Sequence, residues 1–473
     1  MAEPPSRAHD TWLTSDRMIP RRFVRPLLQF THVEAAGGVV LLAAALVAVA
    51  WANSPFSASY FEFWNTHVSI QIGSIHFEET YKEIVNDGLM VIFFFVVGLE
   101  IKRELVVGEL KDRREAALPA FAALGGMIVP AAIYLLIVAG HPDPEATNGW
   151  GIPMATDIAF SVGILSLLGS RISIRLKLFL LALAIADDIG AITVIAIFYT
   201  ADLNVTFLAA AIAALVVIEV AKRIGIRSMV FYVPMGFVVW FLVFESGVHA
   251  TLAGVVLGLM TPVTAWYSDE EYFRRSGWIL SRYKMDSAAP NARARVDEDA
   301  LELAEVAKES VSPLDRLERK LHPWSSFVVV PIFALANAGV SFADAQETVT
   351  SEVTIAVAVG LVLGKLIGIS GFSWLGVKLR LGVMAAGTTW RQVIGVATLA
   401  GVGFTVSLFI TELAFTNELL KDEAKIGVFI GSIIAGIVGF LILRTVKTPQ
   451  QRIEAGRESL GLGDPTEPEP TSA

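Results

Sequence analysis

The stretch LFLLALAIADDIGAITVIAIFY, residues 178–199, decides the fold class, because it is long and apolar enough to cross a bilayer yet carries two adjacent aspartates. About 20 apolar residues span the hydrocarbon core of a membrane. A carboxylate at that depth is costly unless it is paired, protonated or bound to a cation. Asp187 and Asp188 also repel each other because they are neighbours. The pair therefore predicts a site that takes up positive charge, either protons or small metal cations.

The composition of the whole chain agrees with a membrane protein. Its 473 residues are 54% hydrophobic and only 18% charged, and the mean hydropathy is +0.60, which excludes a soluble domain of this length. The absence of cysteine excludes disulfides, metal-thiolate sites and thiol catalysis. No cleavable signal peptide is apparent, because the first 30 residues are polar and their arginines lie far from any small-residue cleavage site. We expect the first membrane helix to serve as the anchor.

Hydrophobic stretches of spanning length recur along the chain and predict an all-α polytopic membrane protein with about twelve transmembrane helices. These stretches lie near residues 35–53, 84–101, 116–139, 151–169, 176–199, 206–221, 229–245, 246–263, 325–341, 352–376, 392–415 and 426–443. They define a membrane domain at 31–446 between an N-terminal tail (1–30) and a C-terminal tail (447–473). The C-terminal tail ends in PTEPEPTSA, and we expect it to be disordered.

Lysine and arginine alternate from loop to loop, which predicts the orientation. The two tails and the even-numbered loops carry most of these residues, including ten between Arg274 and Lys320. The odd-numbered loops hold only Lys82, Lys421 and Lys425. Both termini are therefore expected in the cytoplasm. The long charged loop at 264–322 is expected on the same side, with a short amphipathic helix at 297–308.

One basic residue does not fit the loop pattern, because Lys365 falls near the midpoint of the tenth hydrophobic stretch. Counting residues from the ends of each stretch in the same way places Asp157 near the middle of the fourth stretch and Asp187 near the middle of the fifth. Four ionisable groups, Asp188 included, therefore share one level in the membrane. Depth alone permits a contact between the fifth and tenth helices but does not prove one.

Two of the predicted helices are interrupted close to this level. Residues 150–153 (WGIP) precede Thr156 and Asp157, and residues 400–405 (AGVGFT) break a second apolar run. Paired interruptions of this kind indicate a site at the membrane midplane in transporters, where helix ends supply dipoles and free carbonyls. Glycine is also common in membrane helices for plain packing reasons. The pattern predicts two discontinuous helices, near 151–169 and 392–415.

A short polar segment outside the membrane alternates in hydrophobicity. Residues 66–79 (THVSIQIGSIHFEE) do so around Gly73, within the connection 54–83. This pattern is typical of two strands joined by a turn. We expect a small periplasmic β-hairpin.

Several runs of residues resemble the NhaA-type bacterial sodium/proton antiporters, and they cover about residues 30–446 in order. They are NDGLM (86–90), GLE (98–100) through Glu104, ATDIAF (155–160), LAIADDIGAI (183–192), GVHATLAG (247–254), FALANAGV (333–340) and GK (364–365). NhaA-type proteins are themselves a standard example of inverted structural repeats in transporters. Inverted repeats are therefore implied here by the resemblance and not by the sequence pattern.

The resemblance also implies roles for the residues at the midplane. Asp187 and Asp188 would bind the cation and the protons, with Asp188 as the most direct Na⁺ ligand. Thr156 would contribute an oxygen, Asp157 would balance the facing helix ends, and Lys365 would pair with Asp187. Sodium is a hard cation that prefers oxygen ligands, which agrees with these residue types.

The function that the resemblance implies is electrogenic, pH-regulated exchange of cytoplasmic Na⁺ (or Li⁺) for external H⁺ by alternating access, without an enzyme activity or a cofactor. The site would turn from one face of the bacterial inner membrane to the other. Expected partners are the transported ions, membrane lipid and a second copy of the chain, bound through the hairpin at 66–79. No motif for a nucleotide or a nucleic acid is present.

In the family a cytoplasmic cluster regulates activity by pH. It corresponds here to Glu100, Arg103, Glu104, Glu318 and His322. The expected regulatory set also includes His249, which stands apart from this cluster in the predicted topology. This chain has Arg319 where relatives carry a further histidine. The pH profile of the family is therefore not carried over.

Two other functions place aspartates inside a membrane. An intramembrane aspartyl protease needs two carboxylates that share a proton, but a buried Lys365 would hold one ionised, and the Gly-x-Gly turn of such enzymes is absent before Asp187. A passive cation channel is expected to present rings of equivalent groups, whereas the charges here are unlike. The antiporter is the favoured interpretation.

Overall fold

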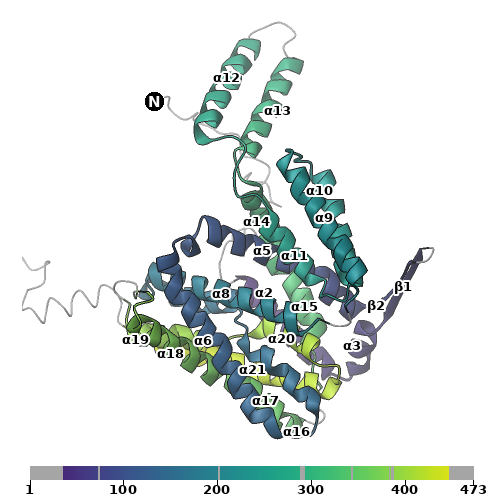
Figure 1. The fold of residues 1–473 in the computed structure, drawn as a ribbon, viewed down its shortest axis with the longest axis vertical. Coiled ribbons are helices and arrows are strands. Elements are labelled where there is room, and N and C mark those ends of the chain that lie inside the picture. The colour runs from purple at the N-terminus through teal and green to yellow at the C-terminus, as the bar shows by residue number, and fades with distance from the viewer. Residues whose placement is uncertain are drawn as a thin grey trace, which may run out of the picture. The chain divides into compact units, whose positions relative to one another are not determined.

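The computed structural model of the chain describes residues 36–72, 75–200, 203–287, 293–341, 345–382, 384 and 388–446. The tails predicted at 1–30 and 447–473 lie outside these residues. The described structure is largely helical (Figure 1), and the chain divides into two compact units. The first comprises Met1–Glu62, Arg113–Val194 and Ala334–Ala473, and the second comprises Phe63–Asp112 and Ile195–Phe333.

The first unit holds the helices around the predicted midplane residues. Its elements are α2 (Ala36–Ala52), α3 (Ser57–Trp64), α6 (Arg113–Ile137), η4 (Val138–Gly140), η5 (Pro144–Met154), α7 (Ile158–Leu167), η6 (Gly169–Arg171), α8 (Ile174–Phe198), α16 (Ala345–Thr350), α17 (Glu352–Val359), η8 (Gly360–Gly364), α18 (Lys365–Lys378), α19 (Trp390–Leu399), α20 (Phe404–Ala414) and α21 (Glu418–Arg444). Helices α3 and α8 run a few residues past the boundary of the unit. Its buried core gathers leucine, valine and alanine from α6, α7, α8, α19 and α21.

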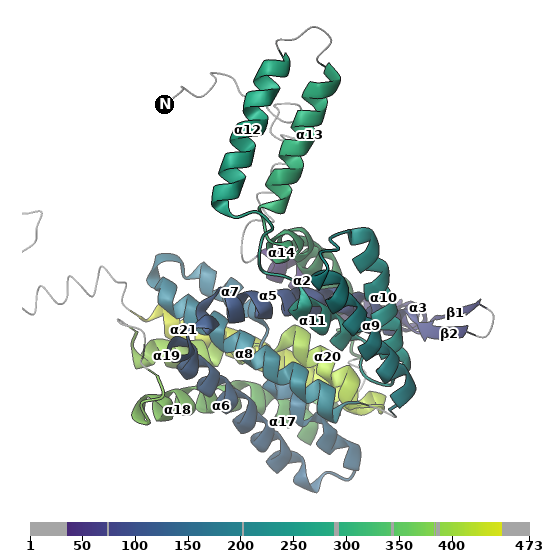
Figure 2. The same cartoon turned by 45° about the horizontal axis from the view of Figure 1, so that its top comes forward.

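The second unit holds the only sheet among the described residues and a set of helices. Its elements are β1 (His67–Ile72), β2 (Ile75–Thr80), α4 (Tyr81–Glu83), η2 (Ile84–Leu89), α5 (Met90–Val106), η3 (Glu109–Lys111), α9 (Val205–Arg223), α10 (Met229–Glu245), α11 (Thr251–Met260), α12 (Asp269–Ser287), α13 (Arg293–Glu309), α14 (Pro313–Trp324), η7 (Ser325–Val329) and α15 (Val330–Asn337), the last of which continues into the first unit. A small core joins α9, α10 and α11. Figures 1 and 2 both show α9 beside α10.

Polar residues just before the first turn explain where several helices begin. Asn204 and Asn417 accept hydrogen bonds from the first backbone N–H groups of α9 and α21. Ser351 does the same for α17, and Ser312 precedes Pro313 at the start of α14. These side chains satisfy N–H groups that have no partner within a helix. Local side-chain caps therefore fix where these four helices begin.

Fewer candidate membrane spans are found in the described part of the chain than the twelve helices expected from the sequence. Within the described residues, six helices are long and apolar enough to cross a membrane, or up to nine if each of three bent pairs is one span. Two of these bent pairs fall at the predicted interruptions: η5 and α7 bend by 42°, and α19 and α20 by 46°. Helices α10 and α11 are apolar but shorter. The count of twelve therefore stays a prediction.

The segment predicted as a hairpin forms two short antiparallel strands. The register pairs His67 with Thr80 and Ile72 with Ile75. Directly after β2, Thr80 and Glu83 form a reciprocal capping box that starts α4. The sheet therefore leads straight into the helical span Tyr81–Val106.

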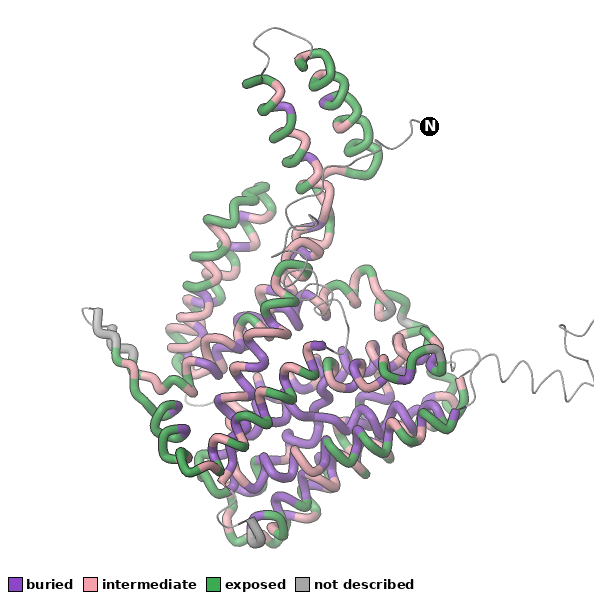
Figure 3. The backbone as a smooth tube through the Cα atoms, turned by 180° about the vertical axis from the view of Figure 1, so that it is seen from behind, coloured by how far each residue is buried: buried purple, intermediate pink, exposed green. Residues whose placement is uncertain are grey.

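The long charged loop is more ordered than the sequence predicted. The helix predicted at 297–308 lies inside α13, and a second helix that was not predicted, α12, lies beside it in Figures 1 and 2. Figure 3 shows that both helices are mostly exposed. Arg282 of α12 bonds to Asp299 and Glu302 of α13 and joins the pair. The sequence signal was weak because the apolar positions are few.

Helices α5 and α11 pack so closely that glycine is required at their contact. A Cβ atom on Gly254 would collide with the carbonyl oxygen of Val91. We expect Gly254→Ala to destabilise the protein by about 1–3 kcal/mol, the usual cost of overpacking. Thermal unfolding measures this effect. Gly277→Ala in α12 is the matched control, since nothing lies within 4 Å of its added Cβ; equal melting temperatures for the two variants would contradict the prediction.

Glu79, at the end of β2, is expected to make stability depend on pH. Burial, reinforced by the neighbouring Glu83, raises the pKa of Glu79 to about 7. In the unfolded chain it ionises near its usual value of about 4.5, so the folded state loses stability as pH rises from about 4.5 to 7 and is constant beyond. Because the side chain is only partly buried, solvent screening limits the effect to the order of 1 kcal/mol.

The measurement is the melting temperature of Glu79→Gln at pH 5 and at pH 8. The substitution should leave the melting temperature near wild type at pH 5 and raise it above wild type at pH 8. The control is Glu78→Gln at the exposed neighbouring position, which should follow wild type at both values. Parallel curves for Glu79→Gln and wild type would show that Glu79 ionises normally.

Candidate functional site

A buried lysine joins two helices at the centre of the first unit. Lys365, at the start of α18, is 0% exposed, and its Nζ donates to Asp187 Oδ2 of α8 at 2.5 Å and to Thr156 Oγ1 at 3.0 Å. The π-helical turn η8 immediately precedes Lys365, and such turns are frequent at functional sites. The contact between the fifth and tenth predicted helices, which depth only permitted, is therefore present.

The second oxygen of the Asp187 carboxylate has no hydrogen-bond partner among the described residues. Asp187 is 1% exposed, and its Oδ1 is buried with no hydrogen bond to any described residue. Asp188, the next residue on α8, is 8% exposed. A buried carboxylate oxygen that accepts nothing is costly, and it is the kind of hard ligand that small cations prefer. The arrangement fits the uptake of a cation beside Lys365.

Thr156 and Asp157 occupy the break between η5 and α7. The Thr156 hydroxyl donates to the carbonyl oxygen of Ala400 at 2.8 Å, within the other break. Asp157 accepts from the backbone N–H of Phe160 at 3.1 Å and of Thr405 at 3.0 Å, and also from the Thr405 hydroxyl. Its carboxylate thus lies at the first turns of both α7 and α20. Negative charge at a helix N-terminus is stabilising, so one carboxylate serves two helix ends.

Thr405 was not predicted as a site residue. The sequence placed it inside the break at 400–405, but a threonine in an apolar helix is unremarkable by itself. Its hydroxyl contacts Asp157 only because the two breaks meet in space. The pairing of interruptions was the signal that could have identified it.

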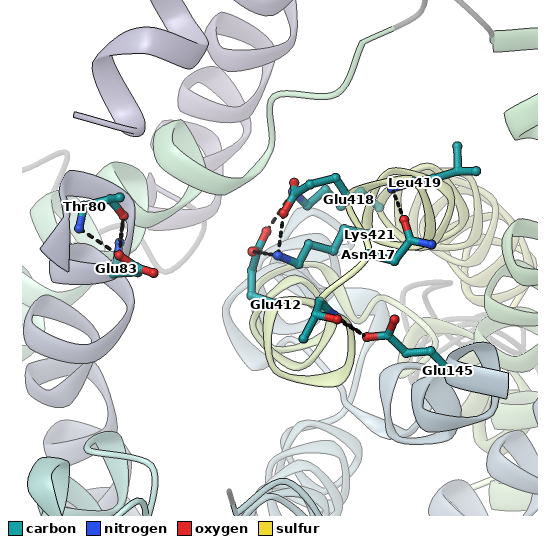
Figure 4. A network of polar contacts seen from close by, with 10 residues as sticks. Thr80, Glu83, Glu145, Glu412, Asn417, Glu418, Leu419 and Lys421 are labelled. Atoms are coloured by element: carbon teal, nitrogen blue, oxygen red, sulfur yellow. Dashed lines mark hydrogen bonds and ion pairs between the residues drawn. The ribbon is translucent and has the colours of Figure 1, made fainter. Parts of the chain in front are cut away.

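A second buried ion-pair network lies away from Lys365, between α20 and α21. Lys425 Nζ lies 2.7 Å from Glu412 Oε1, and both side chains are under 10% exposed. Lys421 lies 3.8 Å from Glu412 and 2.6 Å from Glu418, and Figure 4 shows it pointing toward both. The sequence placed Lys421 and Lys425 in a loop, which is wrong, because α21 already begins at Glu418. The error arose because charged residues extend this helix beyond its apolar stretch.

The residues predicted for pH regulation separate into two places in the second unit. Arg103 of α5 forms an ion pair with Glu318 of α14 at 2.7 Å, and His322 Nε2 lies 4.0 Å from Glu100 Oε1. Glu104 lies one turn beyond Glu100 on α5. The structure therefore brings α5 and α14 together as this grouping requires.

His249 lies elsewhere in the same unit. Its ring Nε2–H donates to the carbonyl oxygen of Tyr199. Gly254 of α11 packs against Val91 and Gly258 against Gly98, so α11 runs parallel to α5. His249 precedes α11 and is therefore level with the start of α5, whereas Glu100 lies near its end.

Comparison with known proteins gives one consistent result. The family model described as Na⁺/H⁺ antiporter 1 matches residues 28–443. Na(+)/H(+) antiporter NhaA 2 of Myxococcus xanthus is 44% identical over 434 residues, 92% of each chain. Na(+)/H(+) antiporter NhaA of Rhodopirellula baltica is 45% identical over 432 residues, 91% of this chain and 96% of the other. Na(+)/H(+) antiporter NhaA 3 of Frankia alni is 46% identical over 420 residues, 88% of each chain.

Among solved structures, the sodium proton antiporter MjNhaP1 from Methanocaldococcus jannaschii superposes with a TM-score of 0.44 at 12% identity, over 89% of this chain and 99% of the other. This likeness is too distant to add to the assignment, which depends on the sequence matches. A family model that covers most of the chain, and relatives above 40% identity over nearly its full length, are sufficient. The chain belongs to the Na⁺/H⁺ antiporter 1 family.

Proposed function

We propose that the protein is a secondary transporter that exchanges cytoplasmic Na⁺ (or Li⁺) for external H⁺ across the bacterial inner membrane, with both termini in the cytoplasm. Family membership supports the reaction. The single observation that supports the site is the buried trio of Lys365, Asp187 and Thr156, with Asp187 Oδ1 lacking a partner. Asp188 is the most direct cation ligand in this proposal.

The chemistry of exchange follows from competition for one set of groups. With Asp187 paired to Lys365, its charge is already compensated. A cation bound by Asp187, Asp188 and Thr156 repels the ammonium of Lys365 and favours loss of its proton, and it also favours ionised Asp188. Protons and the cation therefore exclude each other, and whichever is bound travels when the site turns to the other face. The contact of Asp187 with Lys365 disfavours the protease alternative, which needs a dyad that shares a proton.

The two bent helix pairs are proposed to be discontinuous membrane spans that carry the site. Each break places free backbone groups beside Thr156, Asp157 or Thr405, as in transporters whose broken helices meet at the midplane. In this proposal the chain has twelve helices in inverted repeats. Alternating access is then a movement of the site relative to the rest of the membrane domain.

The hairpin and the charged cluster are proposed to serve assembly and regulation. A two-stranded sheet is marginal in water, and β1 and β2 each leave one edge unpaired within the described chain. A second copy of the chain pairing with this edge would form a homodimer in the lipid bilayer. The contacts of Glu100, Arg103, Glu318 and His322 between α5 and α14 support regulation by pH at this position.

The test of the exchange is a flux measurement in vesicles. Protein reconstituted into liposomes with an acidic lumen and a pH-sensitive dye should dequench the dye when Na⁺ is added outside, because protons leave as sodium enters. Choline chloride at equal concentration is the control and should give no signal. Dequenching that is the same with choline, or absent with both Na⁺ and Li⁺, would contradict the proposed function.

We expect exchange to be electrogenic, with more protons than sodium ions moved per cycle. Lys365, Asp187 and Asp188 are three groups able to titrate beside one cation. A net charge that crosses the membrane gains about 2.3 kcal/mol per 100 mV. Valinomycin and potassium set the potential while the pH is equal on both sides. Sodium flux should then follow the imposed potential, and flux that ignores it would show one-for-one exchange.

A further inference from the structure

Two buried serines occupy equivalent positions beside the two breaks. Ser161 lies four residues after Asp157, which precedes α7, and Ser407 lies four residues after Gly403, which precedes α20. The backbone N–H of each serine makes the first hydrogen bond of its helix, Ser161 to Asp157 and Ser407 to Gly403. Both side chains are 0% exposed. Each serine therefore faces protein from the first turn of a half-helix.

Each hydroxyl donates to the helix that precedes the break in the other bent pair, close to the end of that helix. Ser161 Oγ donates to the carbonyl oxygen of Leu399, the last residue of α19, at 3.1 Å. Ser407 Oγ donates to the carbonyl oxygen of Ile152, near the end of η5, at 2.8 Å. The last carbonyls of a helix have no partner within it and need a donor when they are buried. The two bonds are thus reciprocal: each broken helix supplies one donor and one acceptor.

These bonds set the separation of the breaks that carry the ion site. Between them, Asp157 N–H donates to the carbonyl oxygen of Val402 at 2.6 Å, and Thr156 Oγ1 donates to the carbonyl oxygen of Ala400 at 2.8 Å. The bond to Ala400 uses the only proton of the Thr156 hydroxyl, so this hydroxyl can act only as an acceptor toward other groups. Its lone pairs are left for Lys365 or a cation. The direction of these lone pairs depends on the position of Ala400, because the Thr156 hydroxyl points toward its carbonyl oxygen. Ser161 donates a hydrogen bond to Leu399, the residue just before Ala400, and so helps to fix that position.

We propose that Ser161 and Ser407 are positioning residues that fix the cation affinity of the site by cross-linking the two breaks. Neither hydroxyl contacts Asp187, Asp188 or Lys365 in a hydrogen bond of the described structure. They act through the orientation of Thr156 and Asp157. The inference depends on the proposed exchange function, because it assigns these serines to the site that binds the transported cation.

The experiment measures the KM for Na⁺ and for Li⁺ in proteoliposomes, together with the melting temperature, for Ser161→Ala, Ser407→Ala and the double variant. Each single variant should raise the sodium KM roughly three- to tenfold, the factor for one lost hydrogen bond of ordinary strength. The rate at saturating Na⁺ should stay near wild type. The ratio of the Na⁺ and Li⁺ KM values should also change, since the two ions differ in size. The double variant should show less than the product of the two effects, because both bonds hold the same junction.

Two substitutions serve as matched controls. Ser373→Ala in α18 removes another buried hydroxyl, which has no hydrogen-bond partner in the described structure. Thr411→Val in α20 removes a hydroxyl whose only hydrogen bond within the described residues goes to the backbone carbonyl oxygen of Ser407 in its own helix. Both should keep the wild-type KM. Ser161→Thr retains the donor and should restore most of the affinity; if an alanine variant does not fold, Ser161→Cys, which keeps the size and weakens the bond, replaces it.

The outcomes separate this inference from the proposed function. Wild-type vesicles without sodium-dependent flux would contradict the function itself. If wild type exchanges sodium and the serine variants only melt at lower temperature, with unchanged KM and an unchanged Na⁺ to Li⁺ ratio, the serines are structural and the inference is wrong. A raised KM in the serine variants but not in Ser373→Ala or Thr411→Val supports it.

Discussion

Asp188→Asn is expected to reduce sodium-dependent proton flux to the level of vesicles without protein. The substitution removes the charge of the proposed direct ligand and one titrating group, while the volume of the side chain hardly changes. Asp187→Asn should have the same effect, and it also leaves the ammonium of Lys365 buried without its carboxylate. Both variants are assayed at saturating Na⁺, so that a change in affinity alone does not produce the loss.

Asp143→Asn is the matched control for this pair. Asp143 lies before η5, where its side chain accepts hydrogen bonds from Glu145 N–H and Asn417 and belongs to none of the contacts around Lys365. It should retain exchange. Near-normal flux in Asp188→Asn would overturn the assignment of the cation site, whatever the behaviour of the control.

Lys365→Ala is expected to have the largest effect on stability. Breaking a buried ion pair by removing one partner costs about 3–5 kcal/mol, because the remaining charge is uncompensated. Protonation of Asp187 would reduce this cost, so the loss should be smaller at low pH. Transport should also change, since a titrating group is removed: fewer protons should move per sodium ion. The readouts are the melting temperature and the dependence of sodium flux on membrane potential.

The chain provides a second buried lysine for comparison. Lys425 is 4% exposed and pairs with Glu412 at 2.7 Å, away from the breaks. Lys425→Ala should lower the melting temperature by a similar mechanism but leave the response to the potential unchanged. Equal changes in that response for both variants would show that the effect of Lys365 is structural. An unchanged melting temperature and unchanged flux for Lys365→Ala would show that Lys365 contributes neither to stability nor to transport.

The central residues could be predicted from the sequence because charge inside an apolar stretch has few explanations. Asp187 and Lys365 stood out by depth alone, and the structure joins them. Their contact could not be derived, because the sequence does not specify which helices are neighbours. The family resemblance implied the pair, and the 2.5 Å distance agrees with it.

Site residues with small polar side chains could not be identified in this way, because an uncharged hydroxyl does not stand out in an apolar stretch. Ser161, Thr405 and Ser407 are common residues in membrane helices, and their hydroxyls usually bond to their own helix. Here they bond to a different segment because the breaks at 155–157 and 400–403 lie within hydrogen-bond distance of each other. Only the three-dimensional arrangement identifies their partners.

The helix count and the charged loop illustrate a different limit. Hydropathy detects stretches of apolar residues, but it does not report where a helix begins, so α21 starts eight residues before its predicted stretch at 426–443. It also gives little signal for the exposed helices α12 and α13, whose stability depends on pairs such as Arg282 with Asp299. The sequence predicted only a short helix at 297–308, inside α13, and the existence of α12 required the structure.

The most direct test of competition between protons and sodium is calorimetric titration of the purified protein with Na⁺ at a series of pH values. The apparent Kd should rise as pH falls, by up to tenfold per pH unit for each proton displaced. The heat should also depend on the ionisation enthalpy of the buffer, because bound sodium releases protons. Asp188→Asn should show no sodium heat at any pH. A sodium Kd that is the same from acid to alkaline pH, with no proton release, would contradict the account.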